Sequence, residues 1–258
     1  MSELNTLFRK RIGIPENENV TFETLGYVLE KTAKTIPFEN LCIIENNVSE
    51  ITKDSLFNKI LIRNEGGLCY ELNSIFYFFL IENGFRAALA RGVVYNHASQ
   101  EFLSLGRTHV TILLTHEDQT YIVDTGFGGN LPLKPVPLTG EVVTSPNGEF
   151  RVKKAASEHG DYILEMKLAH KDTAWKTGYA YDSKKPISDV SEFNEIQTII
   201  AEHEQSPFNK NPLITRITYS GNLTLTNTTF TKWADGNVTK EKIDNKRFKE
   251  LAKQHFRI

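Results

Sequence analysis

The stretch EGGLCYELN, residues 65–73, places one of the two cysteines of the chain between a pair of glycines and an apolar run. Gly66 and Gly67 end one helical pattern, and a second pattern begins at Cys69 and continues to about Asn83. A thiol attacks as its thiolate, and the N-terminal end of a helix favours an anion. The glycines also permit a tight turn and leave the backbone open to a substrate. Cys69 is therefore a candidate nucleophile, and the alternative is a small core residue.

The composition is that of an ordinary globular protein and excludes several classes of function. The chain has 258 residues, of which 30 are basic and 32 acidic, so its net charge is −2. This charge does not favour a nucleic-acid partner. The longest apolar run, residues 75–81, is far shorter than the roughly 20 residues that span a bilayer. The N-terminus lacks the apolar core of a secretory signal, and two cysteines cannot build a disulfide framework. We expect a reduced, cytoplasmic protein without a membrane segment.

Changes in hydrophobic period divide the chain into three parts, without a flexible linker between them. Residues 1–85 are helical in pattern, residues 86–187 contain short strands, and residues 188–258 are mixed. The expected helices span residues 21–34, where Thr21 can cap the start, and residues 55–64, 69–83, 188–205 and 239–254. The expected strands include residues 86–95, 109–115, 120–124, 162–168, 177–181, 213–219, 223–227 and 229–233. The many short strands in the middle suggest a sandwich or a small barrel.

Two polar residues stand at the ends of neighbouring predicted strands. His109 opens the strand HVTILLT, and Asp124 closes the strand TYIVD. If these strands pair through the polar turn HEDQ, the start of one lies beside the end of the other. His109 and Asp124 would then be neighbours that could complete a Cys–His–Asp set with Cys69. A structural hydrogen-bonded pair is the alternative, and Cys42, in an apolar stretch without a glycine turn, is expected to be a core residue.

Metal and phosphate-loop chemistry are not indicated. The seven histidines lack tight ligand spacing, and there is no paired-cysteine knuckle, so we expect no metal. The glycine-rich stretches EGGL and TGFGG are not followed by the lysine and hydroxyl pair of a phosphate loop.

Taken together, several motifs of the chain resemble those of the arylamine N-acetyltransferases. The segment PFENL at residues 37–41, the nucleophile segment at 65–73, RTHVTILL at 107–114 and VDTGFGG at 123–129 follow the order and spacing of that family, and SPFN and the C-terminal HFRI are also similar. The resemblance implies an α+β architecture with a cysteine-protease-like catalytic core: a helical bundle over residues 1–85, a β-barrel over 86–187 and an α/β lid over 188–258.

The resemblance also implies an activity and a set of site residues. The implied reaction transfers an acetyl group from acetyl-CoA to the nitrogen of arylamines, arylhydrazines or arylhydroxylamines, in a ping-pong sequence through an acyl-enzyme. Its implied residues are Cys69, His109 and Asp124 for catalysis, Gly106 and Thr218 for CoA, and Phe38, Phe127 and Phe208 for the pocket. The aromatic residues could equally be ordinary core residues. A papain- or transglutaminase-like hydrolase, an amide synthase, and a non-enzymatic binder that keeps the fold are the alternatives.

One position departs from the family pattern. The family has arginine before the two glycines, where this chain has Glu65. That arginine is expected to pair with the acidic residue of the PFEN segment, here Glu39, which Glu65 would repel. Either Arg63 takes over the pairing, or the loop is arranged differently.

Overall fold

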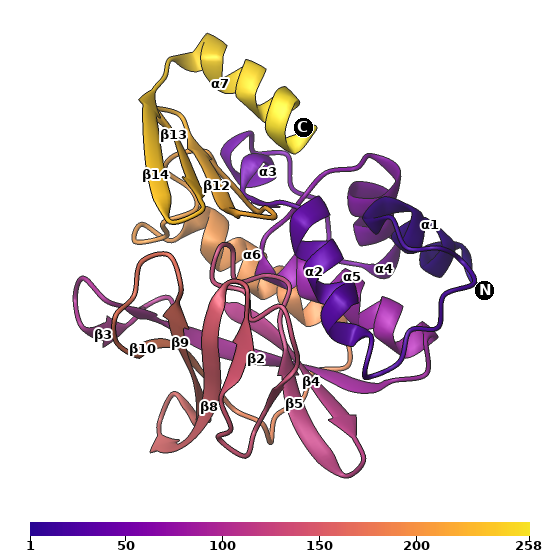
Figure 1. Ribbon diagram of the computed structural model, residues 1–258. Coiled ribbons are helices and arrows are strands. Elements are labelled where there is room, and N and C mark those ends of the chain that lie inside the picture. Colours follow the sequence, from indigo (N-terminus) through magenta and orange to yellow (C-terminus); the bar gives the residue numbers. More distant parts are fainter.

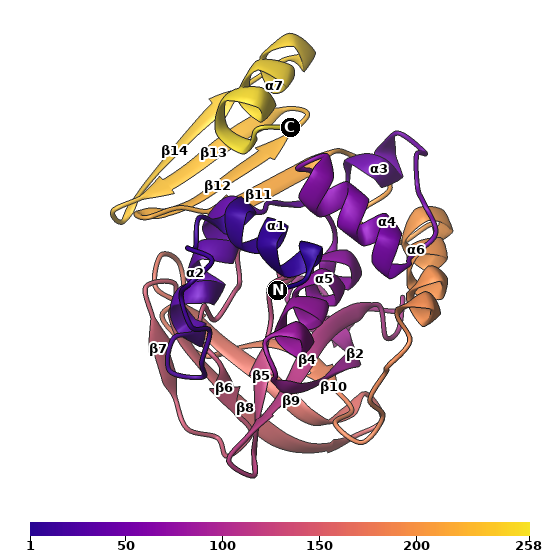
Figure 2. The same cartoon turned by 90° about the vertical axis from the view of Figure 1, so that its right-hand side faces the viewer.

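The computed structural model describes residues 1–258 and contains a helical N-terminal region, a barrel-like antiparallel sheet and a second, smaller sheet. Figure 1 shows the smaller sheet and the C-terminal helix above the barrel, and Figure 2 shows the N-terminal helices packed over the barrel. The predicted α+β fold class is confirmed. The exact division at residues 85 and 187 stays a prediction. No helix has both the length and the apolar character needed to cross a bilayer.

The N-terminal helices pack around α5, which is buried along most of its length. They are α1 (Glu3–Ile12), α2 (Leu25–Thr35), α3 (Leu41–Ile44), α4 (Lys53–Leu56), the π-helical segment η1 (Phe57–Ile62) and α5 (Cys69–Glu82). Phe8 of α1 stacks on Phe79 of α5 with ring centroids 4.5 Å apart. The predicted cap at Thr21 is wrong, because its N–H donates to the Thr24 hydroxyl within a turn and the helix begins only afterwards.

The barrel-like sheet has the strand order β6-β5-β4-β2-β10-β9-β8-β7, and the short strand β3 pairs with β2. The strands are β2 (Arg86–Asn96), β3 (Glu101–Phe102), β4 (His109–His116), β5 (Gln119–Val123), β6 (Val136–Pro137), β7 (Val143–Ser145), β8 (Gly148–Ser157), β9 (Gly160–Leu168) and β10 (Lys176–Tyr181). The predicted hairpin of β4 and β5 is present. Its turn residues, Glu117 and Asp118, both have positive φ, as a tight two-residue hairpin turn requires.

The second sheet joins the C-terminal part of the chain to the PFEN segment. Its order is β1-β11-β12-β13-β14, and its strands are β1 (Phe38–Glu39), β11 (Leu213–Ile217), β12 (Gly221–Thr226), β13 (Thr229–Ala234) and β14 (Asn237–Lys242). The remaining helical elements are η2 (Val190–Glu192), α6 (Phe193–Glu202), α7 (Asn245–Leu251) and the π-helical segment η3 (Ala252–Phe256). The helix predicted from residue 239 starts too early: β14 pairs with β13, and the Asp244 side chain caps α7 by accepting from the Arg247 N–H.

Asn40 connects the N-terminal region to the loop that follows α6. Its side chain is fully buried, and its amide nitrogen donates to the carbonyls of Phe208 and Asn211 at 2.8 and 2.9 Å. Its amide oxygen accepts from the Leu213 N–H at 2.7 Å. One side chain therefore fixes where the loop carrying Phe208 crosses the PFEN segment.

We expect Asn40→Ala to lower the free energy of unfolding by about 2–4 kcal/mol, because it removes three hydrogen bonds and leaves buried partners unsatisfied. Urea unfolding followed by circular dichroism measures this. Asn58→Ala, which removes a single hydrogen bond at an exposed position, is the control and should change stability by no more than about 0.5 kcal/mol. Equal effects of the two changes would contradict the anchoring role of Asn40.

Candidate active site

The predicted Cys, His and Asp residues come together where α5 meets the barrel. Cys69 is the first residue of α5, and His109 is the first residue of β4. Asp124 follows β5 directly, and its Oδ2 lies 2.8 Å from Nε2 of His109. The Cys69 sulfur lies 3.4 Å from the carbonyl oxygen of Thr108, the residue before the histidine. All three side chains are buried, so bulk water does not separate them.

Asp124 is held by a set of donors that leaves its carboxylate no freedom to turn. Oδ1 accepts from the Asn73 amide at 2.9 Å and from the Gly126 N–H at 2.7 Å. Oδ2 accepts from the Tyr179 hydroxyl at 2.9 Å and also contacts Nε2 of His109. The arrangement thus keeps the carboxylate in a fixed position against the imidazole.

Sequence reasoning did not identify Asn73 and Tyr179 as part of this site. Asn73 lies one helical turn after Cys69, and its amide also bonds the Val110 carbonyl and the Thr125 N–H. Its position at the end of the segment 65–73 was a signal that could have found it. Tyr179 comes from β10, 55 residues after Asp124, and only strand pairing brings it to the site.

The buried pair gives the imidazole an unusual affinity for protons. Burial alone would lower the pKa of His109, but the charge of Asp124 and its hydrogen bond outweigh burial and raise the pKa to about 10. The Cys69 sulfur contributes in the same direction. His109 is therefore an imidazolium at neutral pH, with Nδ1 as the ring nitrogen that Asp124 does not occupy.

A cavity of about 540 Å³ opens onto Cys69 and His109. The three predicted aromatic residues line it, and the rings of Phe38 and Phe208 lie 5.6 Å apart. Phe127 lies beside His109, with the two ring centroids 5.1 Å apart. The cavity thus has apolar surfaces from three separate segments of the chain.

The two residues predicted to contact CoA lie outside this cavity. Gly106 lines a neighbouring depression beside Arg107 and Lys185. Thr218 lines another depression and bonds the Gly221 carbonyl within the turn between β11 and β12. Their role toward CoA stays a prediction.

The glycines next to the nucleophile are required by close packing. A Cβ on Gly66 would lie 2.2 Å from the Pro37 carbonyl oxygen, and a Cβ on Gly126 would lie 2.6 Å from the Cα of Cys69. Neither glycine has a positive φ. The expectation that Gly66 and Gly67 leave the backbone open to substrate is wrong, because both are buried against the segment of Pro37 and the side chain of Glu71.

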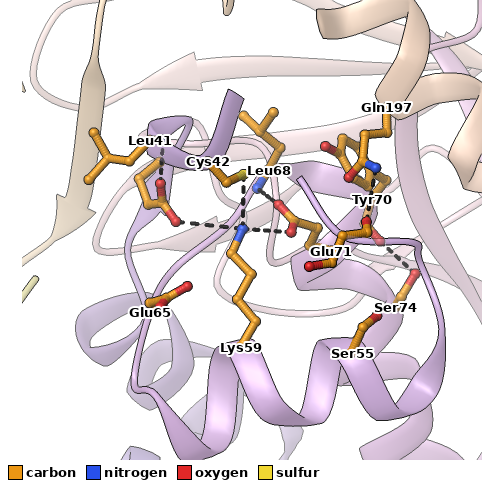
Figure 3. A network of polar contacts seen from close by, with 12 residues as sticks. Leu41, Cys42, Ser55, Lys59, Glu65, Leu68, Tyr70, Glu71, Ser74 and Gln197 are labelled. Carbon is orange, nitrogen blue, oxygen red and sulfur yellow. Dashed lines mark hydrogen bonds and ion pairs between the residues drawn. The ribbon is translucent and has the colours of Figure 1, made fainter. Parts of the chain in front are cut away.

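The cation that compensates Glu39 is Lys59, so of the two alternatives for this loop the pairing with Arg63 is wrong. Arg63 pairs with Glu65 at 2.7 Å on the exposed side of the loop. The Lys59 ammonium, from η1, lies 2.6 Å from Glu71 and 3.8 Å from Glu39 (Figure 3). Burial would lower the pKa of Lys59, but the charges of the two carboxylates raise it, so the ammonium stays charged.

The Lys59 cluster holds the segment that leads into Cys69. The second oxygen of Glu71 accepts from the Leu68 N–H at 2.9 Å, which caps the start of α5. The second oxygen of Glu39 accepts from the Leu41 N–H at 2.6 Å. Burial raises the pKa of Glu39, although Lys59 opposes this. One buried cation therefore connects the PFEN segment to the first turn of the nucleophile helix.

We expect Lys59→Met to lower the free energy of unfolding by about 3–5 kcal/mol at pH 8, because it leaves two buried carboxylates without their cation. The charge of Lys59 opposes the rise that burial causes in the pKa of Glu39, so in the variant that pKa should rise further above its unfolded value. Protonation of Glu39 then stabilises the folded variant as the pH falls, and the deficit should shrink toward pH 5. Urea unfolding at both pH values measures this. Lys53→Met, at an exposed pair with Glu82, should cost no more than about 1 kcal/mol. A deficit that does not depend on pH would contradict this assignment.

Comparison with known proteins places the geometry in a family. Residues 21–258 match the N-acetyltransferase family. An uncharacterized acetyltransferase of Bacillus subtilis is 40% identical over 242 residues, which cover 93% of this chain and 93% of that protein.

Solved structures share the fold across the whole chain. An arylamine N-acetyltransferase from Bacillus cereus superposes with a TM-score of 0.94 at 41% identity, covering 100% of this chain and 99% of that one. That protein has a Cys-His-Glu catalytic triad, whereas the carboxylate beside His109 here is Asp124. An arylamine N-acetyltransferase of Mycobacterium marinum in complex with CoA has the same fold, with a TM-score of 0.84 at 21% identity over 98% of this chain and 92% of that one.

The motifs and the fold agree with these comparisons over nearly the full length of the sequence. The chain belongs to the arylamine N-acetyltransferase family of acyltransferases.

Proposed function

We propose that the protein moves an acetyl group from acetyl-CoA to the nitrogen of an aromatic amine, hydrazine or hydroxylamine, with Cys69 as the temporary carrier. The observation that carries this proposal is the buried His109–Asp124 pair at 2.8 Å, set beside a cysteine at a helix N-terminus that opens into an apolar cavity. CoA is chosen as donor because a protein of the same fold binds it.

In the first half-reaction, the Cys69 thiolate attacks the thioester carbonyl of the donor. The carbonyl π electrons move to oxygen, and the Cys69 N–H, which has no acceptor in the chain, is available to stabilise that charge. The N–H groups of Thr125 and Gly126 are already bonded to Asn73 and Asp124, so neither is the second donor. The C–S bond to CoA then breaks, and the leaving sulfur takes a proton from the His109 imidazolium.

In the second half-reaction, the amine attacks the acetyl group on Cys69. The neutral imidazole of His109 takes the proton that the amine loses, and the Cys69 thiolate leaves. Because the donor product departs before the acceptor reacts, the kinetics are ping-pong. Burial of Cys69 and the apolar walls of Phe38, Phe127 and Phe208 limit the access of water to the acyl group. Transfer should therefore exceed hydrolysis, which separates this reaction from that of a cysteine hydrolase.

Incubation with acetyl-CoA in the absence of an amine should add one acetyl group to Cys69, because the second half-reaction cannot proceed. Intact-mass measurement and peptide mapping locate the modification, and an aniline should then remove it. Cys69→Ala should show no acetylation and no transfer. Cys42→Ala is the matched control and should be acetylated normally, since burial and the Glu71 charge raise the pKa of Cys42 to about 12. Transfer by Cys69→Ala at a near-normal rate would disprove the mechanism.

Asp124→Asn should lower kcat/KM by about 10⁴-fold, by analogy with the equivalent change in a serine triad. The physical reason is that the charge of Asp124 raises the pKa of His109, so its loss should lower that pKa and favour the neutral imidazole and thiol. NMR titration of the His109 ring checks the direction.

Asp124→Glu is the comparison, because it keeps the charge and should retain more activity than Asp124→Asn. If Asp124→Asn and Asp124→Glu lowered kcat/KM equally, and neither changed the pKa of His109, the carboxylate charge would not act through the imidazole.

A further inference from the structure

A second cavity, of about 670 Å³, lies away from the catalytic site and has a strongly cationic lining. It is bounded by the end of α1, the end of α2, the loop before Gly66, strand β11 and the C-terminal segment. Five cationic side chains and no carboxylate are among its lining residues, which are Arg11, Lys34, Thr35, Arg63, Asn64, Arg216, Gln254, His255, Phe256 and Arg257. Such a gathering is unusual in a chain whose net charge is −2.

Three of the five cations have no ion-pair partner. Arg63 pairs with Glu65, and Lys34 pairs with Glu30. Arg11, Arg216 and Arg257 take part in no ion pair in the structure. The Nε atoms of Arg11 and Arg216 are moreover buried and without any hydrogen-bond acceptor. Buried donors of this kind are normally satisfied, so these two nitrogens lack an acceptor. Of the remaining guanidinium nitrogens of Arg11, Nη2 donates to the Glu65 carbonyl at 3.0 Å.

The guanidinium groups also repel one another. Burial and then the charge of Arg257 lower the pKa of Arg11 to about 10, and the charge of Glu65 opposes this only in part. The pKa of Arg216 is lowered by the same two causes in the same order. A cluster of like charges in partly buried surroundings is unfavourable unless an anion compensates it.

This cavity is separate from the one that holds Cys69. Thr215 lines the catalytic cavity, and the next residue of β11, Arg216, lines the cationic one, as expected because successive strand residues point to opposite faces. The two cavities share no lining residue. A ligand in the cationic cavity would therefore not occupy the place of the acyl group or its acceptor.

We propose that this cavity binds a phosphate group, either as inorganic phosphate or as the monoester of a small metabolite. A phosphate supplies several acceptor oxygens and about two negative charges, and the planar guanidinium groups of Arg11, Arg216 and Arg257 match its geometry. The volume of the cavity leaves room for a sugar beyond the phosphate. This binding is independent of the proposed acetyl transfer.

The test compares sodium phosphate with sodium chloride at the same ionic strength and pH, using calorimetric titration and thermal unfolding of the full chain. Phosphate should bind with saturation and raise Tm, because a ligand that binds only the folded state stabilises it. Arg216→Gln and Arg257→Gln should each weaken binding at least about tenfold, since each removes a charge-assisted contact. Arg86→Gln, which removes an exposed arginine of β2 outside the cavity, should bind phosphate as the unaltered chain does.

Ribose 5-phosphate in parallel titrations distinguishes the two sources of the phosphate group. If ribose 5-phosphate binds more tightly than inorganic phosphate, the natural ligand is a phosphate ester. If it binds more weakly, the ligand is the free ion. Either result supports the site. Absence of saturable binding by both probes would overturn the proposal. So would binding that persists unchanged in both Arg216→Gln and Arg257→Gln while each variant keeps its folded circular dichroism spectrum.

Discussion

A strand of only two residues, β1, holds the parts of this molecule together. The backbone N–H of Glu39 donates to the Gly67 carbonyl at 3.0 Å, and the Gly67 N–H donates to the Pro37 carbonyl at 3.3 Å. On its other edge β1 pairs with β11, with Phe38 opposite Thr215. A hydrogen-bonded strand thus lies between the nucleophile loop and the C-terminal sheet. Because Cys69 follows Gly67 by two residues, the position of the sulfur depends on both neighbours of β1.

The sequence was sufficient to predict the parts of the site that are fixed by local pattern. Two strand-like runs, HVTILLT and TYIVD, on either side of the polar turn HEDQ predicted the hairpin, and the hairpin brought His109 and Asp124 together. The glycines before Cys69 and the apolar run after it predicted the start of α5. Lys59 and Tyr179 could not be found in this way. Each reaches the site from a separate element, and no periodicity along the chain encodes which distant side chain will face a buried carboxylate.

The misplaced C-terminal helix has a different cause. Strand β14 is exposed along its whole length, so no buried face marks its period, and its lysine and glutamate residues are also good helix formers. Pairing with β13 decides its structure. The intrinsic secondary-structure preference of residues is a weak guide in an exposed strand, because hydrogen bonds to the neighbouring strand, not burial, stabilise it. The same ambiguity does not arise in β4, whose buried β-branched residues permit only one reading.

The two cysteines of this chain differ in the balance of charged groups beside their thiols. Cys42 lies 3.3 Å from the Lys59 ammonium, a contact that would ordinarily favour a thiolate. Lys59 is already matched by Glu71 and Glu39, so the cluster carries one net negative charge that opposes a second anion. Burial and that charge together raise the pKa of Cys42 to about 12. Cys69 faces a different balance: the charge of His109 is matched by the single carboxylate of Asp124, and the helix N-terminus adds a partial positive charge. A nearby cation therefore does not lower the pKa of a buried thiol where the carboxylates beside it outnumber it.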